Sequence, residues 1–153
     1  MINYCDSSAV TKIYLEETGS AFMRKIRFNL PNAAIFVADI AGPEVLSAMQ
    51  RRFRNGDLNA EMISEARKDF RRDYTEYFNR VSLSESIITL AMQLIEKYPL
   101  RGYDSVQLAT ASYLQSTLRT LDGEEVRFLG ADKVLNSAAQ SEGLIVINPS
   151  EQE

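Results

Sequence analysis

Four acidic residues, each at a point where a strand or loop leads into a helix, are the residues of this chain best suited to chemistry. They are Asp6, Glu44, Asp104 and Asp132. The chain contains no histidine, so imidazole can serve neither as a general base nor as a metal ligand. Ser-His-Asp hydrolysis and histidine-zinc chemistry are therefore excluded. Carboxylates remain as the candidate reactive groups.

Each acid also has a purely structural interpretation. Glu44 follows Pro43, and helix N-termini favour proline followed by an acid. Asp104 and Asp132 could likewise cap helices. In an open parallel sheet, however, ligands bind outside the carboxyl ends of the strands, where the strand order reverses. If the first and fourth strands are neighbours there, Asp6 and Asp132 leave the sheet side by side, and Glu44 and Asp104 can complete the cluster.

Converging carboxylates repel one another, and in a metal-free site at least one would take up a proton through a raised pKa. A divalent cation removes that cost. A site made only of oxygen ligands suits Mg²⁺ or Mn²⁺ better than zinc or copper. Such a site acidifies bound water and stabilises charge that develops on a phosphodiester. The cluster therefore predicts a metal-dependent nuclease.

Short apolar runs alternate with helical patterns along the chain, which predicts a mainly parallel sheet with helices on both faces. We expect strands at residues 2–5, 34–38, 80–83, 126–129 and 144–147. We expect helices at residues 9–17, 20–30, 43–54, 59–79, 84–97, 103–120 and 132–142. The sequence thus indicates a single α/β domain over residues 1–149, with a polar C-terminal tail at 150–153.

Composition supports one ordinary globular domain: 153 residues, 45% apolar and 25% charged. No apolar run approaches the roughly 20 residues of a membrane span, so we expect a cytoplasmic protein. The net charge of −4 argues against broad, non-specific DNA binding. An RNA substrate stays open, because bound divalent ions add positive charge at the site itself. The single cysteine, Cys5, is expected to be buried and unreactive.

Several further residues are candidates for binding. Ser7 could steady a carboxylate or a phosphate oxygen, or simply cap a helix. Asp39 is either an extra metal ligand or a loop or cap acid. The candidates for contacting a nucleic-acid backbone are the arginines with the fewest acidic residues beside them in sequence: Arg51, Arg52 and Arg54.

One helical segment carries aromatic residues at spacings of three and four. This stripe could belong to the core or form a groove for a partner helix, and its members are Phe70, Tyr74, Tyr77 and Phe78. Beside it, basic and acidic residues are interleaved, which favours a solvated helix face over a phosphate track. The residues in question are Arg67, Lys68, Arg71 and Arg72, with Glu65, Asp69, Asp73 and Glu76.

The blocks around the four acids resemble a PIN domain of the VapC toxin type, and the likeness spans almost the whole chain. The matching blocks are residues 6–10 with 12–17, 44–49, 100–104 with 107–111, and 128–136 with 142–144. The resemblance implies a PIN-like three-layer fold with a five-stranded parallel sheet. It also implies Mg²⁺- or Mn²⁺-dependent endoribonuclease activity, a small antitoxin partner and a homodimer. The acidic positions of the family match Asp6, Glu44, Asp104 and Asp132.

The chain departs from the family pattern in two places. Gly130 stands where many relatives carry Ser or Thr, and Gln107 stands where relatives often have His. Gly130 keeps open a second interpretation, a catalytically weak or inactive binding protein with the same fold. A phosphotransfer or phosphatase domain fits poorly, because it would need an acid two residues after Asp6, where Ser8 stands.

Overall fold

The computed structural model describes residues 1–121 and 123–152, and its centre is a five-stranded parallel sheet. The strand order is β3-β2-β1-β4-β5, and each neighbouring pair runs parallel. The strands are β1 (Ile2–Cys5), β2 (Ala34–Ala38), β3 (Asn79–Val81), β4 (Val126–Leu129) and β5 (Ile145–Ile147).

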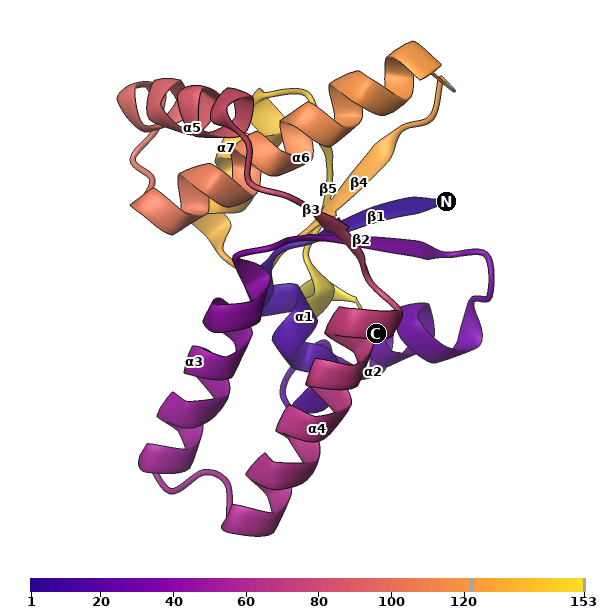
Figure 1. The fold of residues 1–153 in the computed structure, drawn as a ribbon, viewed down its shortest axis with the longest axis vertical. Coiled ribbons are helices and arrows are strands. Elements are labelled where there is room, and N and C mark those ends of the chain that lie inside the picture. The colour runs from indigo at the N-terminus through magenta and orange to yellow at the C-terminus, as the bar shows by residue number, and fades with distance from the viewer. Residues whose placement is uncertain (122, 153) are drawn as a thin grey trace.

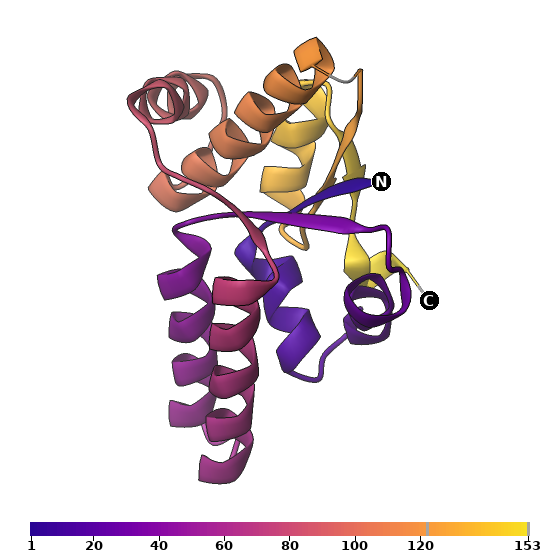
Figure 2. The ribbon, with the colours of Figure 1, turned by 45° about the vertical axis from the view of Figure 1, so that its right-hand side comes forward.

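Helices cover both faces of this sheet, which makes the three-layer arrangement visible in Figure 1. One face carries α1 (Ser7–Tyr14), α2 (Ser20–Arg24), α3 (Ala41–Arg54) and α4 (Ala60–Glu76). The other face carries α5 (Glu85–Lys97), α6 (Gly102–Leu121) and α7 (Lys133–Ser141). Helices α3 and α4 lie side by side and project away from the sheet as a hairpin (Figure 2). None of the described helices is both long and apolar enough to cross a membrane.

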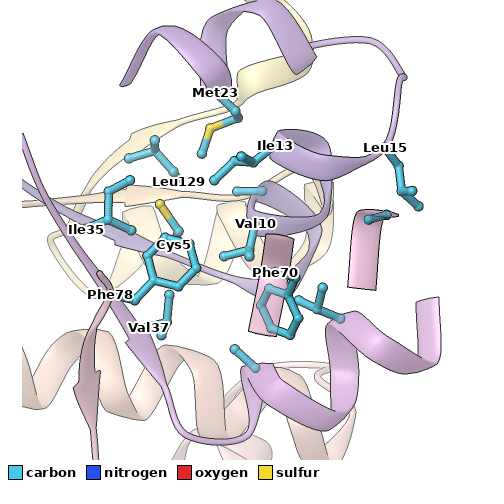
Figure 3. Close-up of a cluster of buried hydrophobic side chains, with 14 of the residues drawn as sticks. Cys5, Val10, Ile13, Leu15, Met23, Ile35, Val37, Phe70, Phe78 and Leu129 are labelled. Atoms are coloured by element: carbon cyan, nitrogen blue, oxygen red, sulfur yellow. The ribbon is translucent and has the colours of Figure 1, made fainter. Parts of the chain in front are cut away.

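Alternating side chains of the strands fill two separate hydrophobic cores, one on each face of the sheet. Cys5, Val37 and Leu129 point into the core beneath α1 to α4, whereas Tyr4 and Phe128 belong to the core beneath α5 to α7. Figure 3 shows the first of these cores, with Cys5 at its centre. The expectation that Cys5 is a buried hydrophobe is therefore confirmed.

The order of the strands reverses at β1, which pairs with β2 on one side and with β4 on the other. At the carboxyl ends of this pair, the backbone N–H of Asp6 donates to the carbonyl of Leu129 at 3.0 Å. The prediction that the first and fourth strands are neighbours is confirmed. The edge at which an open parallel sheet binds its ligands is thus the edge that Asp6 leaves.

The expected helix over 59–79 is three residues too long. Helix α4 ends at Glu76, because the carbonyl of Asp73 accepts the N–H groups of Tyr77 and Phe78, at 2.9 and 2.8 Å, and closes the helix. Asn79 then pairs with Phe36 and begins β3, one residue earlier than expected. Pairing with the sheet overrides the helical pattern here.

Two other predicted helices also differ from the structure. The helix expected over 20–30 is α2 followed by a π-helical turn, η1 (Lys25–Asn29). This wider turn carries the arginine that binds Asp73, Arg27. The helix expected over 9–17 runs instead from Ser7 to Tyr14, since Asp6 caps its first turn.

The start of the polar tail forms a short 3-10 turn, η2 (Pro149–Glu151), and Pro149 is buried against α2. Glu153, the last residue of that expected tail, lies outside the described residues.

The aromatic stripe is mostly core. Phe70 and Phe78 are 1% and 7% exposed, and both point into the core drawn in Figure 3. They cannot line a surface groove, so the groove interpretation is wrong for these two residues. Tyr74 and Tyr77 are half-buried against the same core. The Tyr74 hydroxyl donates to the carbonyl of Asp39 at 2.7 Å, which gives this tyrosine a structural role.

Candidate metal centre

The four acids expected to form a cluster line one cavity of about 410 Å³. Asp6 follows β1 directly and Asp132 lies three residues after β4, so both enter from the carboxyl edge of the sheet. Glu44 and Asp104 enter from the first turns of α3 and α6. Four separate segments therefore bring carboxylates to one place.

Asp6 is the most deeply buried of the four, at 3% exposed. Its Oδ1 accepts the Ser8 hydroxyl at 2.6 Å and the Ala9 N–H at 2.9 Å, which caps α1. Burial raises the pKa of Asp6 to about 6; the two hydrogen bonds lower it, and the charges of Glu44 and Asp104 add to the rise. The Ser8 hydroxyl also accepts the N–H of Ala131, at 2.9 Å, so one side chain ties the ends of β1 and β4 together.

Glu44 is held by two side chains from other helices. Its Oε1 accepts the Gln107 amide at 2.8 Å and the Ser7 hydroxyl at 3.1 Å. The Gln107 oxygen in turn accepts the buried Tyr4 hydroxyl. Burial raises the pKa of Glu44, these two hydrogen bonds lower it, and the charge of Asp104 raises it further. The expectation that Ser7 steadies a carboxylate is confirmed.

Gln107 contacts the cluster directly, whereas the sequence indicated only that it replaces a histidine of the family pattern. It lies one helical turn after Asp104 on the same face of α6, and this i, i+3 spacing was the available signal. What the spacing could not give is its partner, Glu44, which lies 63 positions away in sequence.

Asp104 and Asp132 complete the cluster. Burial raises the pKa of Asp104, and the charge of Asp132 adds to the rise. Asp132 is exposed, and its Oδ1 accepts the N–H of Leu135 at 2.8 Å as the N-cap of α7. For Asp6 and Asp132, capping and clustering are therefore not alternatives. Each carboxylate caps a helix and also faces the shared cavity.

Gly130 packs closely against the cluster. A Cβ at this glycine would lie 2.8 Å from Asp6 Oδ2 and 2.9 Å from Asn136 Oδ1. The Asn136 amide donates to the Gly130 carbonyl at 2.7 Å, and its own Oδ1 is buried without a hydrogen-bond partner. Two side-chain oxygens thus lie against the bare Cα of Gly130, and they would have to move to make room for a side chain there.

The chemistry of these residues fits a hard divalent cation, since the donors are all oxygens and three of the carboxyls have raised pKa values. Within the described ranges, no three acid or cysteine side chains already stand in a ready-made metal-ligand arrangement. Asp6, Glu44 and Asp132 each have one carboxylate oxygen engaged in a hydrogen bond to a neighbouring group.

The other candidate residues separate into two groups. Arg51 and Arg52 line the cavity, whereas Arg54 does not. Arg52 pairs with Glu17 at 3.4 Å. Asp39 is outside the cavity lining and forms an ion pair with Arg80 at 3.1 Å, so it is a loop acid.

Comparison with known proteins gives relatives at the level of sequence and of fold. No family model matches the chain. Ribonuclease VapC45 and ribonuclease VapC49, from two strains of Mycobacterium tuberculosis, are each 32% identical over 108 residues, which cover 71% of this chain and 73% of the relative.

Among solved structures, VapBC2 from Rickettsia felis bound to a promoter DNA fragment superposes with a TM-score of 0.63 and 10% identity, over 97% of this chain and 98% of that one. A toxin-antitoxin complex from Klebsiella pneumoniae superposes with a TM-score of 0.62 and 15% identity, over 96% of this chain and 97% of that one.

Proposed function

We propose that this chain, which belongs to the VapC ribonuclease family, is an endoribonuclease that uses Mg²⁺ or Mn²⁺ to hydrolyse RNA phosphodiesters. The observation that carries the proposal is the convergence of Asp6, Glu44, Asp104 and Asp132 on one cavity at the strand-order reversal. These four residues would hold the ion. When bound, such an ion supplies positive charge that acidifies water and stabilises the charge developing on phosphate.

The protein's own groups would orient the reaction. Gln107 and Ser7 fix the carboxylate of Glu44, while Ser8 and the Ala9 N–H fix that of Asp6. Locked rotamers of this kind keep a site within the narrow geometry that catalysis needs. Asp104 enters the same cavity from the first turn of α6 and would complete the ligand set.

The proposal extends to biology. We place the chain in the cytoplasm as the toxin of a toxin-antitoxin pair, with a small antitoxin as its inhibitor. The fold neighbours that are toxin-antitoxin complexes support this role. We also propose a homodimer, which light scattering on the purified chain should report as twice the mass of one chain.

The direct test is cleavage of single-stranded RNA by the purified protein. We expect cleavage with Mg²⁺ or Mn²⁺, none with EDTA, and a loss of at least about 100-fold in Asp104→Asn, because a charged metal ligand is removed. Asp69→Asn, a surface acid on α4 paired with Arg72 at 3.2 Å, is the matched control and should cleave normally.

Metal binding has a readout that does not depend on activity. An ion that binds only the folded protein at 100 times its Kd stabilises it by about 2.7 kcal/mol. The melting temperature of the wild type should therefore rise with Mn²⁺, and that of Asp104→Asn should rise less. A folded wild type that neither cleaves RNA nor responds to Mn²⁺ would leave the non-catalytic binding protein as the better description.

A further inference from the structure

A second cavity, of about 550 Å³, adjoins the carboxylate cavity and shares Glu44, Arg51 and Asp104 with it. We call it the flanking groove. Its volume lies in the range of 300 to 1,000 Å³ typical of ligand sites. Its lining combines the acids Glu44 and Asp104 with Arg51, Arg101 and Tyr103.

One wall of the flanking groove is a single face of α3. Glu44, Ser47 and Arg51 follow one another at spacings of three and four residues, which places them in one row along the helix. Seven residues separate Glu44 from Arg51, a distance of roughly 10 Å along the helix axis. A strand whose phosphate sits at the carboxylates would therefore meet Arg51 at a different phosphate.

The other wall is the start of α6, with Arg101 and Tyr103 beside Asp104. Tyr103 is 61% exposed, so its ring is open to a ligand. Among the described residues, neither Arg51 nor Arg101 has an acidic partner within 4.0 Å, in contrast to Arg52, which binds Glu17. No ion pair neutralises the charge of either arginine, although the charge of Arg101 also lowers the pKa of neighbouring Asp104. Both lie in a chain whose net charge is −4.

We propose that the flanking groove binds the single-stranded RNA next to the cleavage point, with Tyr103 stacking on an unpaired base and Arg51 and Arg101 contacting phosphates. This inference rests on the proposed function and adds the residues that hold the strand beside the cleavage point. A duplex keeps its bases stacked inside, whereas a single strand can splay a base onto an aromatic ring. Continuity with the carboxylates favours RNA over a protein ligand, because the nucleotide next to the reacting phosphate has to lie in an adjoining space.

The test is the affinity for a labelled, mixed-sequence single-stranded RNA of twelve nucleotides, measured by fluorescence anisotropy with Mg²⁺ present. All variants carry Asp6→Asn, so that the RNA stays intact. Tyr103→Ala should weaken binding roughly 5- to 150-fold, the range for loss of one stacked base. Tyr103→Phe should bind within about twofold of its parent, since the ring is kept. Tyr113→Ala, an exposed tyrosine of the same helix outside both cavities, is the matched control.

The arginines are tested by salt dependence. Arg51→Gln and Arg101→Gln should each reduce the slope of log affinity against log salt by about 0.7, the value for one phosphate contact on a single strand. Arg54→Gln should leave the slope unchanged, because Arg54 lies on the same helix but lines neither cavity. Duplex RNA of the same sequence should be insensitive to Tyr103→Ala.

Unchanged single-strand affinity in Tyr103→Ala, or an equal loss in Tyr103→Phe, would overturn the proposal and leave the groove to a protein partner. RNA cleavage by the protein without the Asp6→Asn change is measured in parallel. If the groove variants lose affinity for RNA while the protein without Asp6→Asn does not cleave RNA, the proposed RNA-binding groove stands and the proposed nuclease activity is refuted. If the protein cleaves RNA with a metal ion while the groove variants bind RNA with unchanged affinity, the nuclease activity stands and the RNA-binding groove is refuted.

Discussion

Two buried aspartates of this protein have opposite surroundings. Asp73, 1% exposed, accepts two bonds from Arg27, at 2.8 and 2.9 Å, and one from the Tyr14 hydroxyl at 2.8 Å. Asp6, 3% exposed, has a hydroxyl and one backbone N–H as donors, and its charged neighbours are the acids Glu44 and Asp104. One carboxylate is surrounded by cations and the other by anions.

Their pKa values move in opposite directions for this reason. Burial alone would raise the pKa of both residues. At Asp73 the hydrogen bonds and charge of Arg27, with the bond from Tyr14, outweigh burial and lower the pKa. At Asp6 burial dominates and raises it to about 6. Where this fold uses a buried carboxylate to join α1, η1 and α4, it supplies the cation itself. At the cavity, no cationic side chain of the described residues lies within ion-pair distance of Asp6.

The largest expected change in unfolding free energy is at Asp73, whose carboxylate is fully hydrogen-bonded and paired with Arg27. Asp73→Asn keeps the shape but leaves half-buried Arg27 without its counter-ion, and breaking a buried pair costs about 3 to 5 kcal/mol. Urea unfolding at pH 7 should show this loss. Because the folded pKa of Asp73 is lowered, its stabilisation is present above the unfolded pKa and disappears as pH falls through the folded value. The variant and the wild type should therefore converge in acid.

Asp69→Asn is the control for that measurement. It also removes an acid that binds Arg72, but from an exposed position of α4, so the change in unfolding free energy should stay below about 1 kcal/mol. Equal effects of the two substitutions would show that the contacts of Asp73 contribute no more than a surface pair.

A stability change of the opposite sign is expected at Asp6, whose carboxylate has no cationic partner among the described residues. In EDTA, Asp6→Asn should stabilise the protein, because an amide keeps the cap on α1 while the buried charge is lost. At about 1.4 kcal/mol for each pKa unit, a rise from 3.8 to about 6 corresponds to on the order of 3 kcal/mol. The folded state binds more protons at Asp6 between these pH values, so the contribution of Asp6 to wild-type stability should fall from about pH 4 to about pH 6 and then level off.

Thermal unfolding across pH 4 to 8 checks this expectation. The two proteins should be equally stable near pH 4 and should differ most above pH 6. Destabilisation by Asp6→Asn at pH 7 would mean that Asp6 is a structural residue like Asp73, and the contrast between the two sites would then fail.

The sequence could predict the cavity site better than the Asp73 site. The four cavity acids lie at element boundaries, and the ends of parallel strands meet at a known edge of a sheet. The charges interleaved around Asp73 predict a solvated helix face, which is wrong for this residue. Its spacing from Ile63, Ala66 and Phe70 places it instead on the buried row of α4, and that periodicity was an unused signal.

Other features could not be predicted from local patterns. The contact of Gln107 with Glu44 joins α6 to α3 and depends on how the helices pack across the end of the sheet. The end of α4 at Glu76 depends on strand pairing between Asn79 and Phe36. Long-range contacts decide both, and propensity along the chain does not contain them.

The smallest expected change in stability is at Gly130. Adding a side chain there would push on Asp6, which tests whether Asp6, unlike Asp73, is positioned to bind an ion. A Cβ there meets Asp6 Oδ2 at 2.8 Å and Asn136 Oδ1 at 2.9 Å, and both are ends of side chains that can move. Gly130→Ala should therefore cost only about 1 kcal/mol in unfolding free energy. The displaced Asp6 oxygen should nevertheless weaken Mn²⁺ binding, on the order of tenfold, as loss of support for a ligand does.

Gly102→Ala is the matched control, since a Cβ there meets no heavy atom within 4 Å. Mn²⁺ titration followed by melting temperature separates the two effects in each variant. A large loss of stability in Gly130→Ala with unchanged Mn²⁺ affinity would assign Gly130 to the packing of Phe128, whose ring lies 3.0 Å from the same point. The expected pattern is weakened Mn²⁺ binding with nearly intact stability. It would show that Asp6 is positioned to bind an ion, whereas Asp73 is positioned to stabilise the fold.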